Sequence, residues 1–153
     1  MDVRISVQEE AFSCGDEIAQ LQIPGVGGVS VFVGVVRDIN EDAAVNGLFL
    51  EHYPGMTEKQ IGKIISEAGS RWAILAATVI HRVGQLEPSD EIVFVGAASA
   101  HRGEAFDACE YIIDYLKTRA TFWKKESLRD GDRWLETRDS DVQTASEWNS
   151  KPD

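Results

Sequence analysis

Two β-rich runs separated by a short turn constrain the fold of this chain more than any other feature. Residues 74–83 and 91–98 consist mainly of Ile, Val, Phe and Ala, and Glu87–Asp90 between them has the composition of a turn. Immediately afterwards, from Ala105 to Leu116, apolar residues recur at the spacing of one helical face. The sequence therefore predicts a sheet that packs against helices, which is an α+β fold.

Two main helices are expected. The first follows Thr57, which we predict as its N-cap with Gln60 as the partner in a capping box, and the second begins near Arg102. The apolar positions that these helices are expected to bury are Ile61, Ile64, Ile65, Ala68 and Trp72 in the first, and Ala105, Cys109, Ile112, Ile113 and Leu116 in the second.

The remaining segments complete one domain over residues 1–153 with an antiparallel or mixed sheet. A polar tail, partly helical, begins at about residue 139. The other expected elements are a half-buried strand from Val3 to Val7, a short helix capped by Ser13 or Asp16 and ending at Leu21, a central strand from Val29 to Val36, a strand from Leu48 to Tyr53 antiparallel to it, and a short last strand from Arg133 to Arg138.

The composition excludes several classes of protein. The chain has 153 residues, 43% hydrophobic and 27% charged, which is typical of an ordinary globular domain. No apolar run approaches the ~20 residues of a membrane span, and the N-terminus lacks the layout of a signal peptide, so we expect a cytoplasmic protein. The net charge of −11 argues against general nucleic-acid binding.

A positive segment stands out in this acidic chain. Residues 117–138 hold seven Lys or Arg against four Asp or Glu, a net charge of +3 that leaves −14 for the rest. Cations at the end of a helix can simply complement its dipole, but that explains only Lys117 and Arg119. The whole segment, with Phe122 and Trp123 among its cations, indicates a site for an anion.

A second candidate anion site precedes the second main helix. His101 and Arg102 lie where a strand meets that helix, and the unpaired N–H groups of a first helical turn favour phosphate. Arg37 follows the apolar run 29–36, and strand ends commonly carry binding residues. The plainer alternatives are a histidine that caps the helix and a solvated arginine, and the residues alone leave both open.

Lys117 is the sharpest candidate for chemistry. A lysine becomes an acid, base or nucleophile when burial or a neighbouring cation lowers its pKa, and Lys124, Lys125 and Arg119 supply such neighbours. Solvated lysines at the end of an amphipathic helix are the simpler interpretation.

The histidines and cysteines offer less chemistry. His52 and His81 lie in strand-like runs, and no pair of histidines has the spacing of metal ligands on one helix, so we expect neither a metal nor a cofactor. Cys109 falls on a buried helical stripe and Cys14 has no adjacent base, so neither is expected to be catalytic.

Four segments in this order closely resemble the large catalytic subunit family of molybdopterin synthase. The resemblance covers about residues 29–138, and Ile39 and the glycines at 25–28 are its small departures. The segments are FVGVVRD, LEHYPGMTEKQI, IHRVGQLEPSDEIVFVGAASAHR and DYLKTRATFWKKE…DGDRWLETR.

The resemblance implies an α/β hammerhead fold and a sulfurtransferase of molybdenum cofactor biosynthesis. The family uses a thiocarboxylate on the C-terminal glycine of a small ubiquitin-like subunit, ending in Gly-Gly, to convert cyclic pyranopterin monophosphate into the molybdopterin dithiolene. It also implies a homodimer that forms a heterotetramer with two small subunits. The matching positions are Lys117 and Lys124 as catalytic residues, and Arg37, His101, Arg102, Lys125, Glu126 and Arg138 as substrate-binding residues.

Helix geometry adds one prediction. His101 and Lys117 are sixteen residues apart on what we expect to be one helix, which separates them by roughly 24 Å at ~1.5 Å per residue. If both serve one site, His101 and Arg102 must come from a second copy of the chain. Two alternatives to the enzyme are a non-catalytic module that docks an acidic C-terminal tail and a pterin- or nucleotide-phosphate-binding protein without sulfur chemistry.

Overall fold

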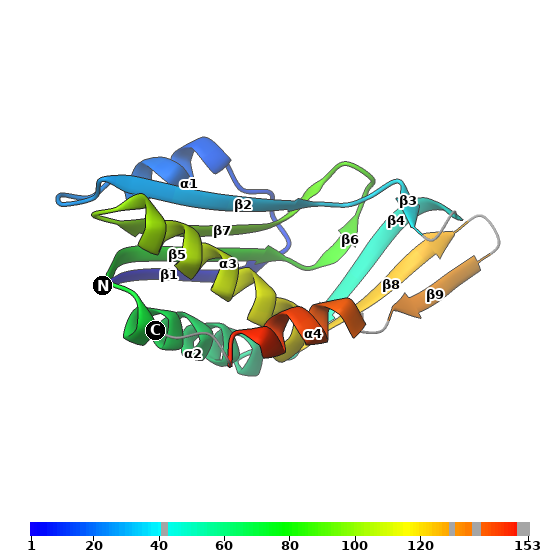
Figure 1. Ribbon diagram of the computed structural model, residues 1–153. Coiled ribbons are helices and arrows are strands. Elements are labelled where there is room, and N and C mark those ends of the chain that lie inside the picture. The colour runs from blue at the N-terminus through cyan, green and yellow to red at the C-terminus, as the bar shows by residue number, and fades with distance from the viewer. Residues whose placement is uncertain (41–42, 129–130, 136–138, 150–153) are drawn as a thin grey trace.

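Two sheets and the helices around them make up the structure (Figure 1), a computed structural model that describes residues 1–40, 43–128, 131–135 and 139–149. The mixture of helices and strands confirms the predicted α+β class. Within these residues the first sheet contains, in spatial order, β1 (Asp2–Gln8), β5 (Ile74–Arg82), β7 (Glu91–Ser99) and β2 (Gly28–Val35).

The predicted β-rich pair forms the centre of the first sheet. β5 and β7 are antiparallel, β1 joins β5 in parallel, and β2 joins β7 antiparallel, so the sheet is mixed. The prediction that Val29–Val36 is a central strand is wrong, because β2 lies at the edge of the sheet (Figure 1). One face of β2, with Val29, Val31 and Val33, packs against a core cluster, and this apolar pattern does not reveal how many strands lie beside it.

Helices cover both faces of the first sheet. α1 (Cys14–Leu21) begins at Ser13, whose Oγ accepts a hydrogen bond from the Asp16 N–H at 3.3 Å, which confirms the first of the two predicted caps. On the opposite face lie α2 (Met56–Arg71), α3 (Arg102–Arg119) and α4 (Asp139–Glu147) (Figure 1).

The start of α2 differs from the prediction. Gly55 is its N-cap, with a φ of 84° that favours glycine, and the Gly55 N–H donates to the Glu58 carboxylate at 2.6 Å. Thr57 and Gln60 therefore do not form a capping box. Thr57 lies inside the helix, fully buried, and both side chains bond elsewhere.

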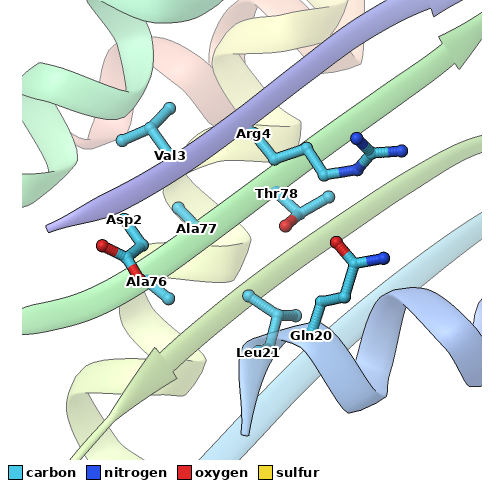
Figure 2. A pocket seen from close by; sticks show the side chains of 8 residues that line it. All are labelled: Asp2, Val3, Arg4, Gln20, Leu21, Ala76, Ala77 and Thr78. Atoms are coloured by element: carbon cyan, nitrogen blue, oxygen red, sulfur yellow. The ribbon is translucent and has the colours of Figure 1, made fainter. Parts of the chain in front are cut away.

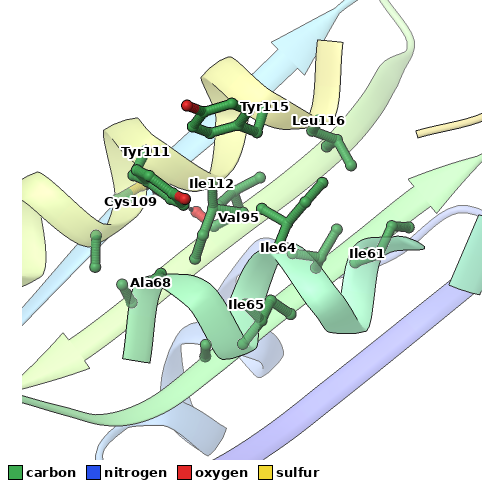
Figure 3. Close-up of a cluster of buried hydrophobic side chains, with 14 of the residues drawn as sticks. Ile61, Ile64, Ile65, Ala68, Val95, Cys109, Tyr111, Ile112, Tyr115 and Leu116 are labelled. Carbon is green, nitrogen blue, oxygen red and sulfur yellow. Dashed lines mark hydrogen bonds between the residues drawn. The ribbon is translucent and has the colours of Figure 1, made fainter. Parts of the chain in front are cut away.

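The main core lies between α2, α3 and the first sheet (Figure 3). All the predicted apolar positions of α2 are buried except Trp72, which caps the helix and packs partly exposed against the core. In α3, Ile113 is likewise only partly buried. The fully or nearly fully buried members are Ile61, Ile64, Ile65 and Ala68 from α2, and Ala105, Cys109, Ile112 and Leu116 from α3.

The second sheet corrects one prediction and contains strands that the sequence did not suggest. It contains, in the described residues, β3 (Ile39–Asn40), β4 (Ala43–His52), β6 (Gly84–Leu86), β8 (Phe122–Leu128) and β9 (Gly131–Leu135). β4 extends the predicted strand 48–53 but pairs with β3, β6 and β8 rather than with β2. The positive segment is only partly a helix end: Lys117 and Arg119 lie in the last turn of α3, whereas Lys124 and Lys125 lie on β8, between β4 and β9 of this sheet.

The C-terminal part of the chain is better anchored than a polar tail. β9 begins two residues before the predicted strand 133–138, whose last three residues lie outside the described part. α4 confirms the expected helix, and Trp148 after it is only 4% exposed, with its Nε1 donating to Asp114 at 2.7 Å. In the described residues, no helix is long and apolar enough to cross a membrane.

Candidate active site

The two predicted catalytic lysines lie on neighbouring elements where the two sheets meet. Lys117 is exposed in the last turn of α3, and Lys124 is partly buried in the middle of β8. A tight connection of two residues, Ala120 and Thr121, joins the elements. The structure therefore brings together the pair that the sequence suggested.

Lys124 has the electrostatic character of a reactive lysine. Burial lowers the pKa of its ammonium first, and the positive charge of Lys117 lowers it further. The carboxylate of Asp141, on α4, acts in the opposite direction. Asp141 belongs to the segment expected to be a polar tail, so its place beside Lys124 was not predicted.

A buried histidine completes this cluster. His81 is 5% exposed, and its ring stacks on Phe122 with centroids 3.8 Å apart and an interplanar angle of 19°. Nδ1 lies 2.8 Å from the carbonyl oxygen of Arg82, so Nδ1 carries the proton of the neutral ring. Burial lowers the pKa of His81 to about 3, with smaller contributions from Lys124 and Lys117.

His81 is therefore a packed residue rather than a surface residue, and its neighbours were not foreseen. The ring is neutral at physiological pH, so it adds a flat apolar surface beside the lysines and no third charge. Its position near the end of a strand was the only signal in the sequence, and that signal did not point to the lysines.

Lys125 and Glu126 are both separated from the lysine pair, Lys125 because it points to the other face of β8 and Glu126 because it is buried and paired with Arg133. The Lys125 ammonium lies 5.5 Å from the ring of Phe49 and 5.4 Å from that of Trp134, across neighbouring strands. Because side chains alternate along a strand, Lys125 faces away from Lys124. Glu126 shares the face of Lys124 but is 5% exposed and accepts hydrogen bonds from the Arg133 guanidinium at 2.9 and 3.0 Å.

His101 and Arg102 lie at the far end of α3 from Lys117. His101 is the exposed N-cap and Arg102 the first helical residue, so one unbroken helix separates them from the lysine pair. The first turn of α3 already contains a carboxylate, that of Glu104, which accepts a hydrogen bond of 2.9 Å from the Ser99 hydroxyl. Within one copy of the chain, the two halves of the predicted site do not meet.

Of the glycines at 25–28, Gly27 is explained by its close contact with the residues that precede α3. A Cβ on Gly27 would lie 2.2 Å from the carbonyl oxygen of Ala100, so no larger residue fits there without a shift of the backbone. The Gly27 N–H also donates to the Ser99 carbonyl oxygen at 2.9 Å.

Two further predicted substrate-binding residues are arginines. Arg37 is exposed just after β2, and Arg138 lies outside the described residues.

Neither cysteine resembles a nucleophile. The Cys14 thiol lies 2.8 Å from a carboxylate oxygen of Glu91, and burial together with that carboxylate raises the pKa of Cys14 to about 11. Cys109 is 4% exposed in the core, and burial raises its pKa as well. The prediction that both are non-catalytic fits these surroundings.

Two shallow hollows mark the surface of the described residues. One, of about 230 Å³, is lined by Gln60, Lys63 and Arg119 and lies beside the connection between the two lysines. The other, of about 160 Å³, lies between α1, β1 and β5 (Figure 2). It is lined by Arg4, Gln20 and Thr78 among others, and no predicted site residue reaches it.

Comparison with known proteins agrees with this architecture. The family model described as MoaE protein matches residues 7–119. The molybdopterin synthase catalytic subunit of Pseudomonas aeruginosa is 57% identical over 146 residues, which cover 94% of this chain and 97% of that protein. The corresponding subunit of Escherichia coli K12 is 52% identical over 148 residues, with 96% and 99% covered.

Solved structures show the same fold over the whole chain. The molybdopterin biosynthesis MoaE protein from Burkholderia ambifaria superposes with a TM-score of 0.83 and 44% identity, covering 99% of this chain and 100% of that one. The match extends well beyond the segments that carried the resemblance, and it includes both lysine-bearing elements. The chain therefore belongs to the MoaE protein family.

Proposed function

We propose that this chain is the catalytic subunit of a molybdopterin synthase, a sulfurtransferase of molybdenum cofactor biosynthesis. The observation that carries the proposal is the pair Lys117 and Lys124, with a neutral His81 beside it and a lowered pKa at Lys124. Relatives with more than half of their residues identical are named as this subunit. The precursor is a cyclic pyranopterin monophosphate, and the reaction takes place in the cytoplasm.

The sulfur comes from a partner. The relatives are named as the catalytic subunit of an enzyme, which implies another subunit, and neither cysteine of this chain has the surroundings of a sulfur donor. We infer that the sulfur donor is a small ubiquitin-like protein whose C-terminal Gly-Gly ends in a thiocarboxylate. That anion suits a cluster of two lysines, because it would offset part of their positive charge.

The two lysines have different surroundings and take different roles. Lys117, exposed at the end of α3, receives the thiocarboxylate, and assists proton transfer or capture of the acyl group as the sulfur leaves. Lys124, partly buried, holds the pterin intermediate. A bound anion would raise the lowered pKa of Lys124, so substrate or tail binding should take up protons.

The phosphate half of the pocket comes from a second copy of the chain. α3 holds His101 and Lys117 roughly 24 Å apart at ~1.5 Å per residue, so one copy cannot direct both onto one small pterin. A homodimer, carrying one small subunit at each end, would place His101 and Arg102 of one copy beside Lys117 of the other. Arg37, Lys125, Glu126 and Arg138 remain candidates for further substrate contacts.

Reconstitution tests the activity. The purified chain, a thiocarboxylated small subunit and the cyclic precursor should yield the dithiolene product, and Lys117→Ala should abolish the product while tail binding persists. Lys59→Ala is the matched control, because it removes an exposed lysine of α2 that does not belong to the pair. Tail binding without turnover by the unaltered chain would identify a non-catalytic docking module instead.

Complementation tests the shared pocket. A dimer made of one Lys117→Ala copy and one His101→Ala copy has one pocket with both changes and one with neither. It should recover about half of the turnover of the unaltered dimer, although each variant alone is inactive. A mixed dimer as inactive as its parents would show that each pocket belongs to a single copy.

A further inference from the structure

The connection between the two lysines is held from α2. The Thr121 N–H and hydroxyl both donate to the Gln60 side-chain oxygen, at 2.7 and 2.6 Å. The Thr57 hydroxyl lies 3.0 Å from the Thr121 carbonyl oxygen and can donate to it. The backbone and side chain of Thr121 are thus both bonded to one helix, sixty-one residues away in the case of Gln60.

The next residue is held from the other side. Phe122 stacks on His81 of β5, and its N–H donates to Ala120 at 3.1 Å, which tightens the turn. Lys117 lies three residues before this turn and Lys124 three residues after Thr121. The turn therefore sets where α3 ends relative to β8, and with it the relative position of the two ammonium groups.

We propose that Gln60 is a positioning residue for the lysine pair. Its two hydrogen bonds with Thr121 fix the turn between α3 and β8, and so keep Lys117 and Lys124 at the relative position that the reaction needs. This inference rests on the proposed function of the two lysines. The side-chain oxygen of Gln60 accepts its two hydrogen bonds from Thr121, so its influence on the lysines passes through that residue. Preorganised positioning of this kind matters because a ~1 Å displacement of a catalytic group can cost ~100-fold in rate.

The surroundings make a clean substitution possible. Gln60 is partly exposed beside Lys63 and Arg119, and the Arg119 guanidinium is paired with Glu67. Gln60→Met has similar length and helix propensity but accepts no hydrogen bond from Thr121. Gln60→Glu retains an acceptor oxygen at the same place. Lys63→Met changes the same hollow without touching Thr121 and serves as the matched control.

Two measurements test the proposal on the reconstituted full-length complex. Gln60→Met should lower kcat by about 10-fold or more, while the KM for the precursor changes by less than about 2-fold. Gln60→Glu and Lys63→Met should remain within about 2-fold of the unaltered enzyme in kcat. Undiminished kcat in Gln60→Met, or a loss in Gln60→Glu as large as in Gln60→Met, would overturn the proposal.

The second measurement needs no substrate. NMR titration of the Lys124 side chain in the free protein should show that its pKa rises in Gln60→Met towards the ordinary lysine value, and that it stays lowered in the folded Lys63→Met control. The groups facing Lys124 are Lys117, Asp141 and His81, so a change in their placement is detected directly. An unaltered pKa in folded Gln60→Met refutes the positioning role, whereas an inactive unaltered enzyme refutes only the proposed function.

Discussion

The buried His81 makes a quantitative prediction about stability and pH. Its pKa falls from 6.5 to about 3 in the folded chain, mainly because burial disfavours the charged ring. Below pH 6.5 the unfolded chain binds a proton at His81, whereas the folded chain does not. Protonation of the unfolded state therefore lowers the free energy of unfolding progressively as the pH falls from 6.5 towards 3, and has no effect well above pH 6.5. At pH 5.0 the loss amounts to about 2 kcal/mol, and it approaches about 5 kcal/mol when both states are protonated.

Urea unfolding at pH 7.5 and pH 5.0 measures this loss. His81→Phe and His81→Gln both remove the titrating ring, so the free energy of unfolding of either variant should fall by about 2 kcal/mol less between the two pH values than that of the unaltered chain. Because other carboxylates and histidines remain in every protein, their contributions cancel in the comparison. Protein concentration is held constant, since a dimer links stability to concentration. An equal pH dependence in all three proteins would show that His81 titrates normally and would refute the reasoning.

Three further predictions concern the lysine pair, Gly27 just before β2, and Gly15 in α1. Lys117→Met should raise the pKa of Lys124, because it removes a neighbouring positive charge, and NMR titration of Lys124 checks this; an unchanged value would place the two ammonium groups too far apart to interact. Gly27→Ala should destabilise the chain by about 1–3 kcal/mol in thermal or urea unfolding, since the added methyl meets the Ala100 carbonyl oxygen at 2.2 Å. Gly15→Ala, with nothing within 4 Å of its added methyl and a helical position in α1, should instead be neutral or stabilising by up to about 1 kcal/mol.

Local sequence patterns predicted the elements whose buried faces carry mainly apolar side chains. β5, β7 and the buried stripes of α2 and α3 are apolar where they face the core, so spacing alone located them. β8 escaped prediction because its inward face carries Lys124 and Glu126. Their compensating charges come from Asp141 and Arg133 on other elements, and a single strand pattern cannot display such partners.

The candidate site was predictable to a similar extent. The density of cations pointed to Lys117, and the resemblance to the family added Lys124. The apolar spacing between Arg102 and Leu116 predicted a helix long enough to separate Lys117 from His101. The support around the pair was not predictable. Gln60 and Thr121 are sixty-one residues apart, and Thr57 and Gln60 imitate a capping box so well that their bonds to Thr121 were concealed.

The order of strands in the first sheet has a consequence for synthesis of the chain on the ribosome. β1 and β2 are made first, yet their partners β5 and β7 emerge only after Ile74 and Glu91 have been translated. At a translation rate of ~5–20 residues per second, the uncharged segment GVSVFVGV of β2 remains unpaired for several seconds before its neighbouring strand β7 is synthesised. Such a segment can pair with other nascent chains, so slow translation or delayed release should favour aggregation at β2 before any enzyme exists.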